Sequence, residues 1–156
     1  MRSHTEQIFN MDFHIAKRNI VTVSKDKTIR LWDIENFDQV YEFSSPVDQP
    51  LSVAAHPQLP LFSCGFESGV MRVFDIDRTC VADEFSQFNK PLLKLKYSPN
   101  GDFLVTCCQD GGVAIHNARR QHLPIKMMQL EFPPEHVHVA FTSLVASVSH
   151  ASYDEN

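Results

Sequence analysis

The sequence predicts an all-β fold that is assembled from repeated four-stranded units. Three sets of residues recur at steps of 42: Asp33, Asp75 and Asn117; Trp32, Phe74 and His116; Phe13, Ala55 and Tyr97. Between them, runs such as Thr28 to Asp33 alternate apolar and polar residues, which is typical of a strand with two distinct faces. A fixed step in this range indicates stacked repeats. We therefore expect a binding surface rather than a catalytic cleft.

The pattern predicts where each strand lies. Strands are expected at 8–13, 20–24, 28–33 and 39–43, at 51–55, 61–65, 70–75 and 81–85, and at 92–97, 103–108 and 113–117. Further strands are expected at 137–141 and 144–148. We divide the chain into units of about 4–43, 49–85 and 91–128, with an incomplete unit at 137–150. Pro124, Pro133 and Pro134 predict irregular connections, because proline lacks the donor of a ladder hydrogen bond.

The composition fits a globular protein of the cytoplasm. Of 156 residues, 43% are hydrophobic and 21% are charged, with a net charge of −5 that argues against a nucleic-acid partner. The sequence has no apolar run long enough for a membrane span and no apolar signal segment near Met1. Four cysteines without Cys-x-x-Cys spacing favour free thiols in a reducing compartment.

The sequence carries no catalytic motif, so we predict a protein that is not an enzyme. It lacks a nucleophile elbow, a phosphate loop and the helical motif of metalloproteases. His136 and His138 share one face of an expected strand, a spacing that suits a metal, but no third ligand lies nearby. We expect no cofactor, no metal and no small-molecule substrate.

Four polar residues of the first unit resemble a motif of the WD-repeat family of β-propellers. His4, Thr22, Asp26 and Trp32 match the hydrogen-bonded tetrad of that family, and Trp32-Asp33 matches its signature dipeptide. The resemblance implies a structural tetrad, in which Asp26 accepts from His4, the histidine engages the Thr22 hydroxyl, and that hydroxyl accepts from the indole of Trp32. Such a chain satisfies polar groups inside a blade.

The other units match that family less closely. Phe74-Asp75 and His116-Asn117 stand where the first unit has Trp-Asp, and Ser68 replaces the turn aspartate that unit three keeps as Asp110. A propeller closes with typically 4–8 blades. Three blades and part of a fourth therefore predict an incomplete ring, and we expect the chain to be a piece of a longer protein.

Longer stretches, including His4 to Phe9 and Met11 to His14, are similar to large WD-repeat proteins of centrioles. The resemblance implies a protein-interaction scaffold at the centriole or ciliary base that takes part in centriole or cilium assembly. Tubulin or microtubule-wall proteins are the implied partners, bound by the full-length protein. The alternative is a general WD-repeat adaptor in signalling or ubiquitin-dependent turnover. Ile34-Glu35 after Trp32-Asp33 lacks the arginine typical of ubiquitin-ligase receptors.

Overall fold

The computed structural model describes residues 4–131, 136–139 and 146–149. The regular secondary structure of these residues is β-strand, apart from the 3-10 helix η1 (Ile15–Lys17). Unit one, residues 8–44, is the sheet of β1 (Ile8–His14), β2 (Asn19–Ser24), β3 (Thr28–Asp33) and β4 (Gln39–Ser44). Unit two, residues 50–86, contains β5 (Pro50–Ala55), β6 (Leu61–Phe66), β7 (Val70–Asp75) and β8 (Cys80–Ser86). Unit three, residues 92–129, contains β9 (Leu92–Tyr97), β10 (Phe103–Cys108), β11 (Gly112–Asn117) and β12 (Leu123–Gln129).

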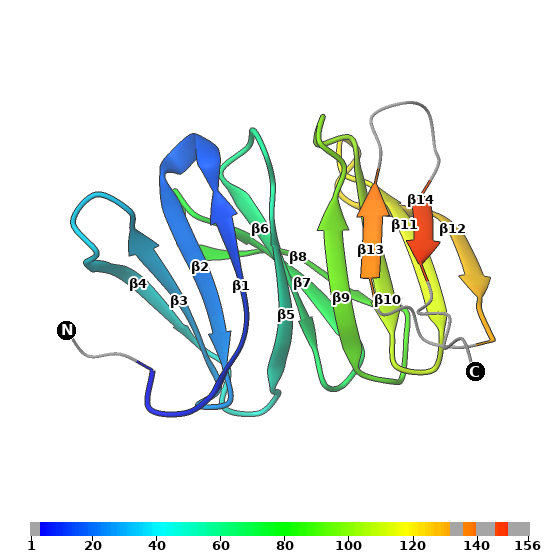
Figure 1. Ribbon diagram of the computed structural model, residues 1–156, viewed down its shortest axis with the longest axis horizontal. Helices are drawn as coiled ribbons and strands as arrows, with labels where there is room; N and C mark the ends of the chain where they lie inside the picture. The colour runs from blue at the N-terminus through cyan, green and yellow to red at the C-terminus, as the bar shows by residue number, and fades with distance from the viewer. Residues whose placement is uncertain (1–3, 132–135, 140–145, 150–156) are drawn as a thin grey trace, which may run out of the picture.

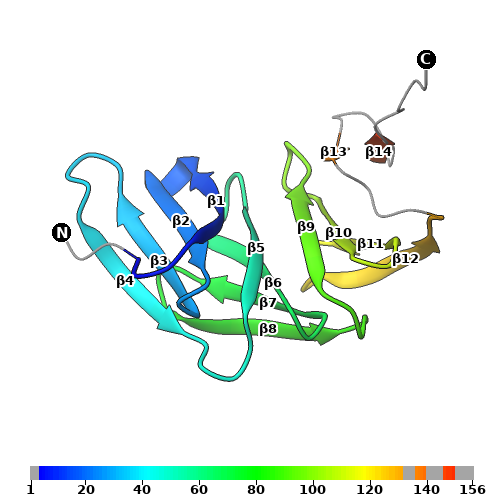
Figure 2. The same ribbon diagram turned by 60° about the horizontal axis from the view of Figure 1, so that its bottom comes forward.

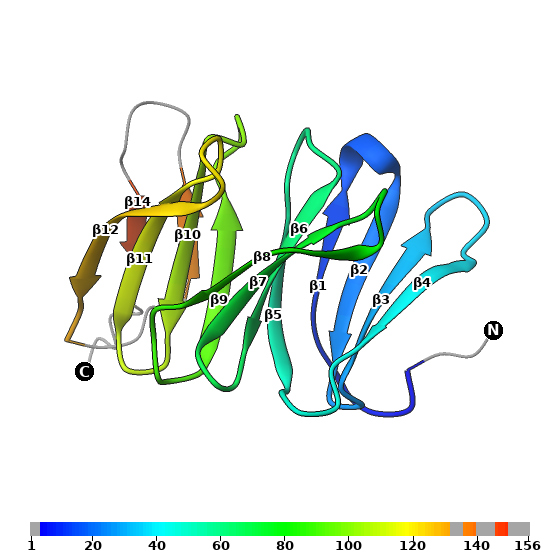
Figure 3. The ribbon, with the colours of Figure 1, turned by 180° about the vertical axis from the view of Figure 1, so that it is seen from behind.

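Each unit is an antiparallel meander, and the units stand side by side as in a propeller that is not closed (Figure 1). The first strands β1, β5 and β9 are neighbours, and β9 also contacts β13 (His136–Val139), which pairs with β14 (Ala146–Ser149). Figure 2 shows the sheets following one another with the β13–β14 hairpin beyond the third, and Figure 3 shows the outer strands β4, β8 and β12 from behind. The predicted all-β fold, with propeller blades in an incomplete ring, is confirmed.

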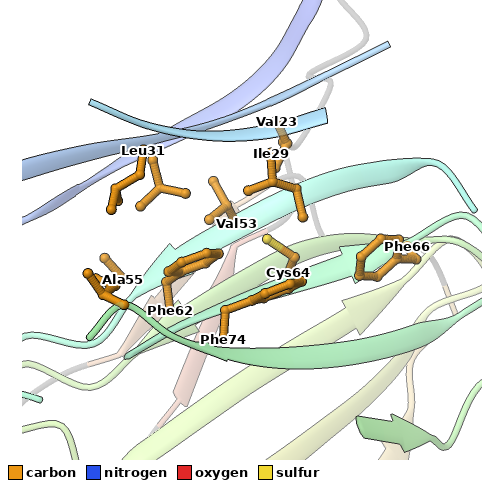
Figure 4. Packing of buried hydrophobic residues seen from close by; sticks show 11 residues of the cluster. Val23, Ile29, Leu31, Val53, Ala55, Phe62, Cys64, Phe66 and Phe74 are labelled. Atoms are coloured by element: carbon orange, nitrogen blue, oxygen red, sulfur yellow. The ribbon is translucent and has the colours of Figure 1, made fainter. Parts of the chain in front are cut away.

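The hydrophobic core lies between units, because each sheet has apolar side chains on both faces. Figure 4 shows the side chains of Val23, Ile29 and Leu31 of unit one pointing toward unit two. Val21 belongs to the same buried cluster, and we call the face of these four residues the trailing face. They pack against Val53, Ala55, Phe62 and Phe74 on the opposite face of unit two, which we call its leading face. Phe62 and Phe74 stack with ring centroids 4.9 Å apart. Units two and three meet in the same way through a second buried cluster.

The turns keep their backbone conformation across the repeat even where their residues differ. Lys27, Gly69 and Gly111 occupy one position of the hairpin turn at steps of 42, and all three have a positive φ. Glycine adopts this region without the steric cost that lysine meets in unit one. Phe37, Thr79 and Gln121 form a second left-handed series with φ between 51° and 57°.

One pair of turn positions has reversed charge in units one and three. Arg18 pairs with Glu35 in unit one, and Asp102 pairs with Arg119 at the equivalent positions of unit three. In unit two these positions hold Pro60 and Asp77, and Asp77 instead accepts from Lys17 Nζ of unit one at 2.7 Å. The two ends of the arc therefore carry the same ion pair with opposite orientation.

The structure changes one prediction made from proline. Pro124 lies inside β12, at the bulge opposite His116, rather than in an irregular connection. Because β12 is the outer strand of its sheet, the missing N–H of Pro124 disrupts no second ladder. Pro133 and Pro134 lie outside the described residues, as do parts of the strands expected at 137–141 and 144–148.

Candidate functional site

The structure brings His4, Thr22, Asp26 and Trp32 together in a chain of contacts that runs from the turn between β2 and β3 into the sheet of unit one. His4 Nδ1 lies 2.9 Å from Asp26 Oδ2, and His4 Nε2 lies 2.6 Å from Thr22 Oγ1. Trp32 Nε1 donates to Thr22 Oγ1 at 2.9 Å. These contacts are consistent with Nδ1–H donating to the carboxylate while the threonine hydroxyl donates to Nε2. The side chains of His4 and Asp26 are 2% and 7% exposed, so the contacts are shielded from water.

Asp26 receives more hydrogen bonds than the four-residue motif predicts. Thr28 donates from its hydroxyl at 2.6 Å and from its backbone at 3.0 Å, and the Thr5 backbone donates at 3.1 Å. Burial acts to raise the pKa of Asp26, but the hydrogen bonds from Thr28, His4 and Thr5 outweigh it and lower the pKa to about 2. The carboxylate therefore fixes both the turn and the segment that leads into β1.

Unit two replaces this polar chain with apolar contacts. Cys64 and Phe74 occupy the positions equivalent to Thr22 and Trp32, and Phe74 stacks on Phe62 instead of donating a hydrogen bond. Burial raises the pKa of the Cys64 thiol well above its usual value, so this cysteine is a packing residue. Unit two is therefore stabilised by apolar packing of its two faces against the neighbouring units, and not by a hydrogen-bonded tetrad.

Unit three keeps part of the polar chain in altered form. His116 replaces the tryptophan, and its Nε2 lies 3.3 Å from the Thr106 hydroxyl. Its Nδ1 lies 3.0 Å from the backbone carbonyl of His122. Burial lowers the pKa of His116, which favours a neutral ring that donates through Nδ1. The Asp110 carboxylate accepts from Gly112 N at 3.1 Å within its own turn.

Two histidines that the sequence analysis did not single out join neighbouring units. His14 Nε2 lies 2.6 Å from the Leu59 carbonyl of unit two, and His56 Nε2 lies 3.0 Å from the Gly101 carbonyl of unit three. Each ring accepts through Nδ1 from the backbone three residues later, Lys17 or Leu59. The two histidines are 42 residues apart, and so are the two carbonyl groups that they contact. The recurrence of histidine at this spacing was a sign in the sequence that His14 and His56 have equivalent roles.

A second polar network connects units two and three inside the core. The hydroxyls of Ser63 and Tyr97 lie 2.6 Å apart, and Tyr97 Oη lies 2.7 Å from His122 Nε2. His122 is 1% exposed, and its Nδ1 has no hydrogen-bond partner among the described residues. Burial, followed by the nearby rings of His116 and His56, lowers the pKa of His122 to about 4. Sequence alone gave no sign of this network, because its members come from three separate strands and turns.

An open groove of about 410 Å³ lies between units one and two, at the same end as the tetrad. Its lining residues come from the β4–β5 connection and from β7 and its turn: Ser44, Ser45, Pro46, Val47, Asp48, Ser68 and Arg72. Arg72 Nε donates to Glu84 at 2.6 Å while its guanidinium lies 4.4 Å above the Phe66 ring. Val47 is 94% exposed beside it. An exposed aliphatic side chain with hydroxyls and backbone groups suits contact with a polypeptide.

Metal-binding groups and membrane-spanning helices were both sought among the described residues. Within them, His, Cys, Asp and Glu side chains form no group of three or more with metal-binding geometry. The same residues include no helix that is long and apolar enough to cross a bilayer. Cys64, Cys107 and Cys108 are buried free thiols, while Cys80 is exposed.

A family model described as WDR90/POC16, second beta-propeller, matches residues 12–152. The chain belongs to the WDR90/POC16 family. The WD repeat-containing protein 90 of Xenopus tropicalis is 38% identical over 125 residues, which are 79% of this chain and 7% of that protein. The human protein of that name is 34% identical over 113 residues, which are 72% of this chain and 6% of that protein. This WDR90/POC16 chain therefore spans less than a tenth of the length of these relatives.

One more protein is similar in sequence, and two solved structures are similar in fold. The human Echinoderm microtubule-associated protein-like 1 is 26% identical over 116 residues, which are 74% of this WDR90/POC16 chain and 14% of that protein. Among solved structures, U3-55K matches with a TM-score of 0.82 at 13% identity, covering 91% of this chain and 45% of that one. The RRP9 WD40 repeats match with a TM-score of 0.82 at 14% identity, covering 91% of this chain and 44% of that one. The resemblance to WD-repeat β-propellers is confirmed.

Proposed function

We propose that this chain is a scaffold segment of a larger centriolar or ciliary microtubule-associated protein that takes part in centriole or cilium assembly. Membership of the WDR90/POC16 family is the observation that carries the proposal. The WD-repeat propeller is generally a non-catalytic scaffold for protein partners, and rigid sheets present loops to such partners. The name of the 26% identical relative, a microtubule-associated protein, supports tubulin or microtubule-wall proteins as the partner class.

The groove between units one and two is the surface that we propose for this contact. Its exposed residue Val47 and the neighbouring hydroxyls of Ser44, Ser45 and Ser68 lie at the mouth of an inter-unit junction. The cation of Arg72 is held at the wall by Glu84 and Phe66, so it is positioned before a partner arrives. Glu84 balances the charge of Arg72 and Asp48 also lines the groove, so the contact that we propose there rests on aliphatic and hydrogen-bonding groups rather than on net charge.

Imaging of the tagged full-length protein tests the location. We expect signal at the centriole or ciliary base, in the cytoplasm rather than inside a membrane compartment. A diffuse cytoplasmic signal that never overlaps a centriole marker would contradict the centriolar proposal. That result would favour the alternative of a general WD-repeat adaptor.

Photo-crosslinking tests the partner and the surface together. A photoreactive residue at position 47 of the full-length protein should capture tubulin or a microtubule-wall protein. The same residue at position 123 is the matched control, since Leu123 is 53% exposed on the outer strand of unit three, away from the groove. Equal capture at both positions would contradict the assignment to the groove, while capture of other proteins alone would contradict the microtubule partner.

A further inference from the structure

Two serines of the chain are followed directly by proline, and they differ in accessibility. Ser98, which precedes Pro99, is 3% exposed. Its hydroxyl donates to Asn100 Oδ1 at 2.7 Å and accepts from the Phe103 backbone at 2.9 Å. Ser98 therefore belongs to the internal structure of its turn, and an enzyme can reach it only when this turn opens.

The other serine, Ser45, lies in the connection between β4 and β5 and is accessible. Ser45 is partly exposed, Pro46 is exposed and Val47 is 94% exposed. The Ser45 backbone is fixed, because its N–H donates to the Lys27 carbonyl at 2.9 Å. The Ser45 hydroxyl has no hydrogen-bond partner among the residues that the structure describes. An anchored segment thus presents a free hydroxyl at the surface of the groove.

The proline gives this segment the form that a protein kinase binds. A residue before proline is restricted to an extended backbone, and proline itself has no N–H. An enzyme pocket without an acceptor for that N–H selects proline, because any other residue would bury an unpaired donor there. Protein kinases of the proline-directed class make this selection at the position directly after the acceptor serine. Ser45-Pro46 combines this sequence with an accessible hydroxyl, whereas Ser98-Pro99 does not.

Two cations lie beside the place that a phosphate on Ser45 would occupy. Lys27 Nζ donates to the Pro46 carbonyl at 3.1 Å, so this amine lies next to the peptide that follows the serine. Arg72 lines the same groove as Ser45, and its side chain is 25% exposed. Ammonium and guanidinium groups hold phosphates through charge-assisted hydrogen bonds.

The acidic groups beside the groove leave these cations available to a phosphate. Asp48 accepts from the Ser68 hydroxyl at 2.5 Å and from the Ser68 backbone at 3.2 Å. Glu84 accepts from Arg72 Nε at 2.6 Å, but Glu84 is 54% exposed, so water weakens this pair. A phosphate carries about two negative charges at pH 7 and therefore competes with Glu84 for the guanidinium.

We infer that Ser45 is a phosphorylation site of a proline-directed protein kinase, with the phosphate held between Lys27 and Arg72. Ser45 Oγ forms a bond to the γ-phosphorus of ATP, while the bond from that phosphorus to the oxygen that bridges to the β-phosphate breaks. ADP leaves, and the hydroxyl proton passes to the catalytic base of the kinase. The added phosphate makes the groove negative. The modification requires no particular partner in the groove, so it is independent of the centriolar proposal.

Phosphorylation of the full-length protein in vitro tests the site. The native protein and synthetic peptides of the two segments are incubated with ATP and purified mitogen-activated and cyclin-dependent kinases, which belong to the proline-directed class. Mass spectrometry reads the phosphate at each serine, and each native rate is divided by the rate of its peptide. We expect this ratio to be at least about tenfold lower for Ser98 than for Ser45, because Ser98 requires local opening.

Pro46→Ala is the matched variant for this assay, because it keeps the acceptor serine and removes the residue that the kinases select. We expect it to slow phosphorylation of Ser45 by about tenfold or more. A native protein that stays unmodified at Ser45 with both kinases would overturn the inference. So would equal ratios for Ser45 and Ser98, or a Pro46→Ala rate equal to that of the wild type.

Removal of the phosphate tests where it is held. A serine/threonine phosphatase is added to the phosphorylated full-length protein and its variants, and loss of phosphate from Ser45 is followed by mass spectrometry. Lys27→Ala and Arg72→Gln should each speed removal about threefold, the size expected for an exposed ion pair. Lys25→Ala is the control, since Lys25 is an exposed lysine of the same turn whose side chain has no partner among the described residues. Equal rates in all variants would contradict the placement of the phosphate between the two cations.

Discussion

Single residues decide whether a unit has a polar or an apolar interior at the position of the tetrad. Trp32 and Thr22 exchange a hydrogen bond in unit one, whereas Phe74 beside Cys64 removes both polar groups from unit two. Replacing both partners together avoids an unpaired buried group, which is the costly case. The change from one solution to the other therefore needs two substitutions, and unit three shows an intermediate in which His116 keeps a contact with Thr106.

Asp26→Ala is expected to lower the free energy of unfolding by about 1–3 kcal/mol, because His4, Thr28 and Thr5 each lose an acceptor. Trp32 is the one tryptophan of the sequence, so urea unfolding followed by its fluorescence reports on unit one. Asp38→Ala, an exposed aspartate of the same unit, is the control and should change little. An Asp26→Ala unfolding curve that overlays the wild type would contradict a stabilising tetrad.

At the scale of the strands, the sequence predicted most of the fold because alternation and turn residues are local signals. The strands at 28–33, 70–75, 92–97 and 103–108 were predicted with their observed bounds, and the other predicted strands differ at their ends by one or two residues within the described part of the chain. The strand β12 was not predicted. The His14 and His56 contacts and the Ser63–Tyr97–His122 network were missed. They join residues 25–45 positions apart, and a single sequence does not reveal which side chains such distant segments bring together.

The inter-unit histidines predict a test of coupling between neighbouring sheets. His14→Ala leaves the Leu59 carbonyl and the Lys17 amide without their partner, which costs about 1–3 kcal/mol when buried. Lys17→Ala is the control: it removes an exposed ion pair to the same neighbouring unit, worth about 0–1 kcal/mol. Hydrogen exchange should rise at both faces of the first junction only in His14→Ala. Equal exchange in the two variants would argue against coupling through His14.

The low pKa of His122 predicts loss of stability in mild acid. The folded protein holds this imidazole neutral down to about pH 4, while an unfolded histidine takes up its proton near pH 6.5. Unfolding therefore binds a proton within this window, and stability falls as pH decreases from 6.5 towards 4. Urea unfolding should show that His122→Gln abolishes about 1–2 kcal/mol of the loss between pH 7.5 and 5. An unchanged pH profile in the variant would contradict this assignment.

At the scale of the whole molecule, the arc is a stack in which each sheet depends on its neighbours. The core clusters lie between units, so a unit without a neighbour exposes an apolar face. The WDR90/POC16 family model matches residues 12–152 as one range and marks no boundaries within it. The division of the chain into units of about 4–43, 49–85, 91–128 and 137–150 stays a prediction, which limited proteolysis at the connections can test.

The isolated 156-residue chain is expected to self-associate through sheet edges and through the leading face of unit one, where Met11 is 49% exposed and Phe13 is 51% exposed. Sedimentation velocity should show species larger than the 17.8 kDa monomer that grow with concentration. The double variant Met11→Lys, Phe13→Lys should shift the distribution towards the monomer, because it places charges on the exposed face. A clean monomer with a sharp melting transition in the unmodified chain would contradict this expectation.

The reversed ion pairs in the β1–β2 and β3–β4 turns of unit one and their counterparts in unit three distinguish these two blades. Grafting the β1–β2 turn of the first blade into the third would set Arg18 against Arg119, and the reciprocal graft would set Asp102 against Glu35. Both chimaeras would bring like charges together at the rim, whereas exchanging both turns of a blade would restore attraction. The first and third blades therefore have similar backbones but differ in which of the two turns carries the positive charge.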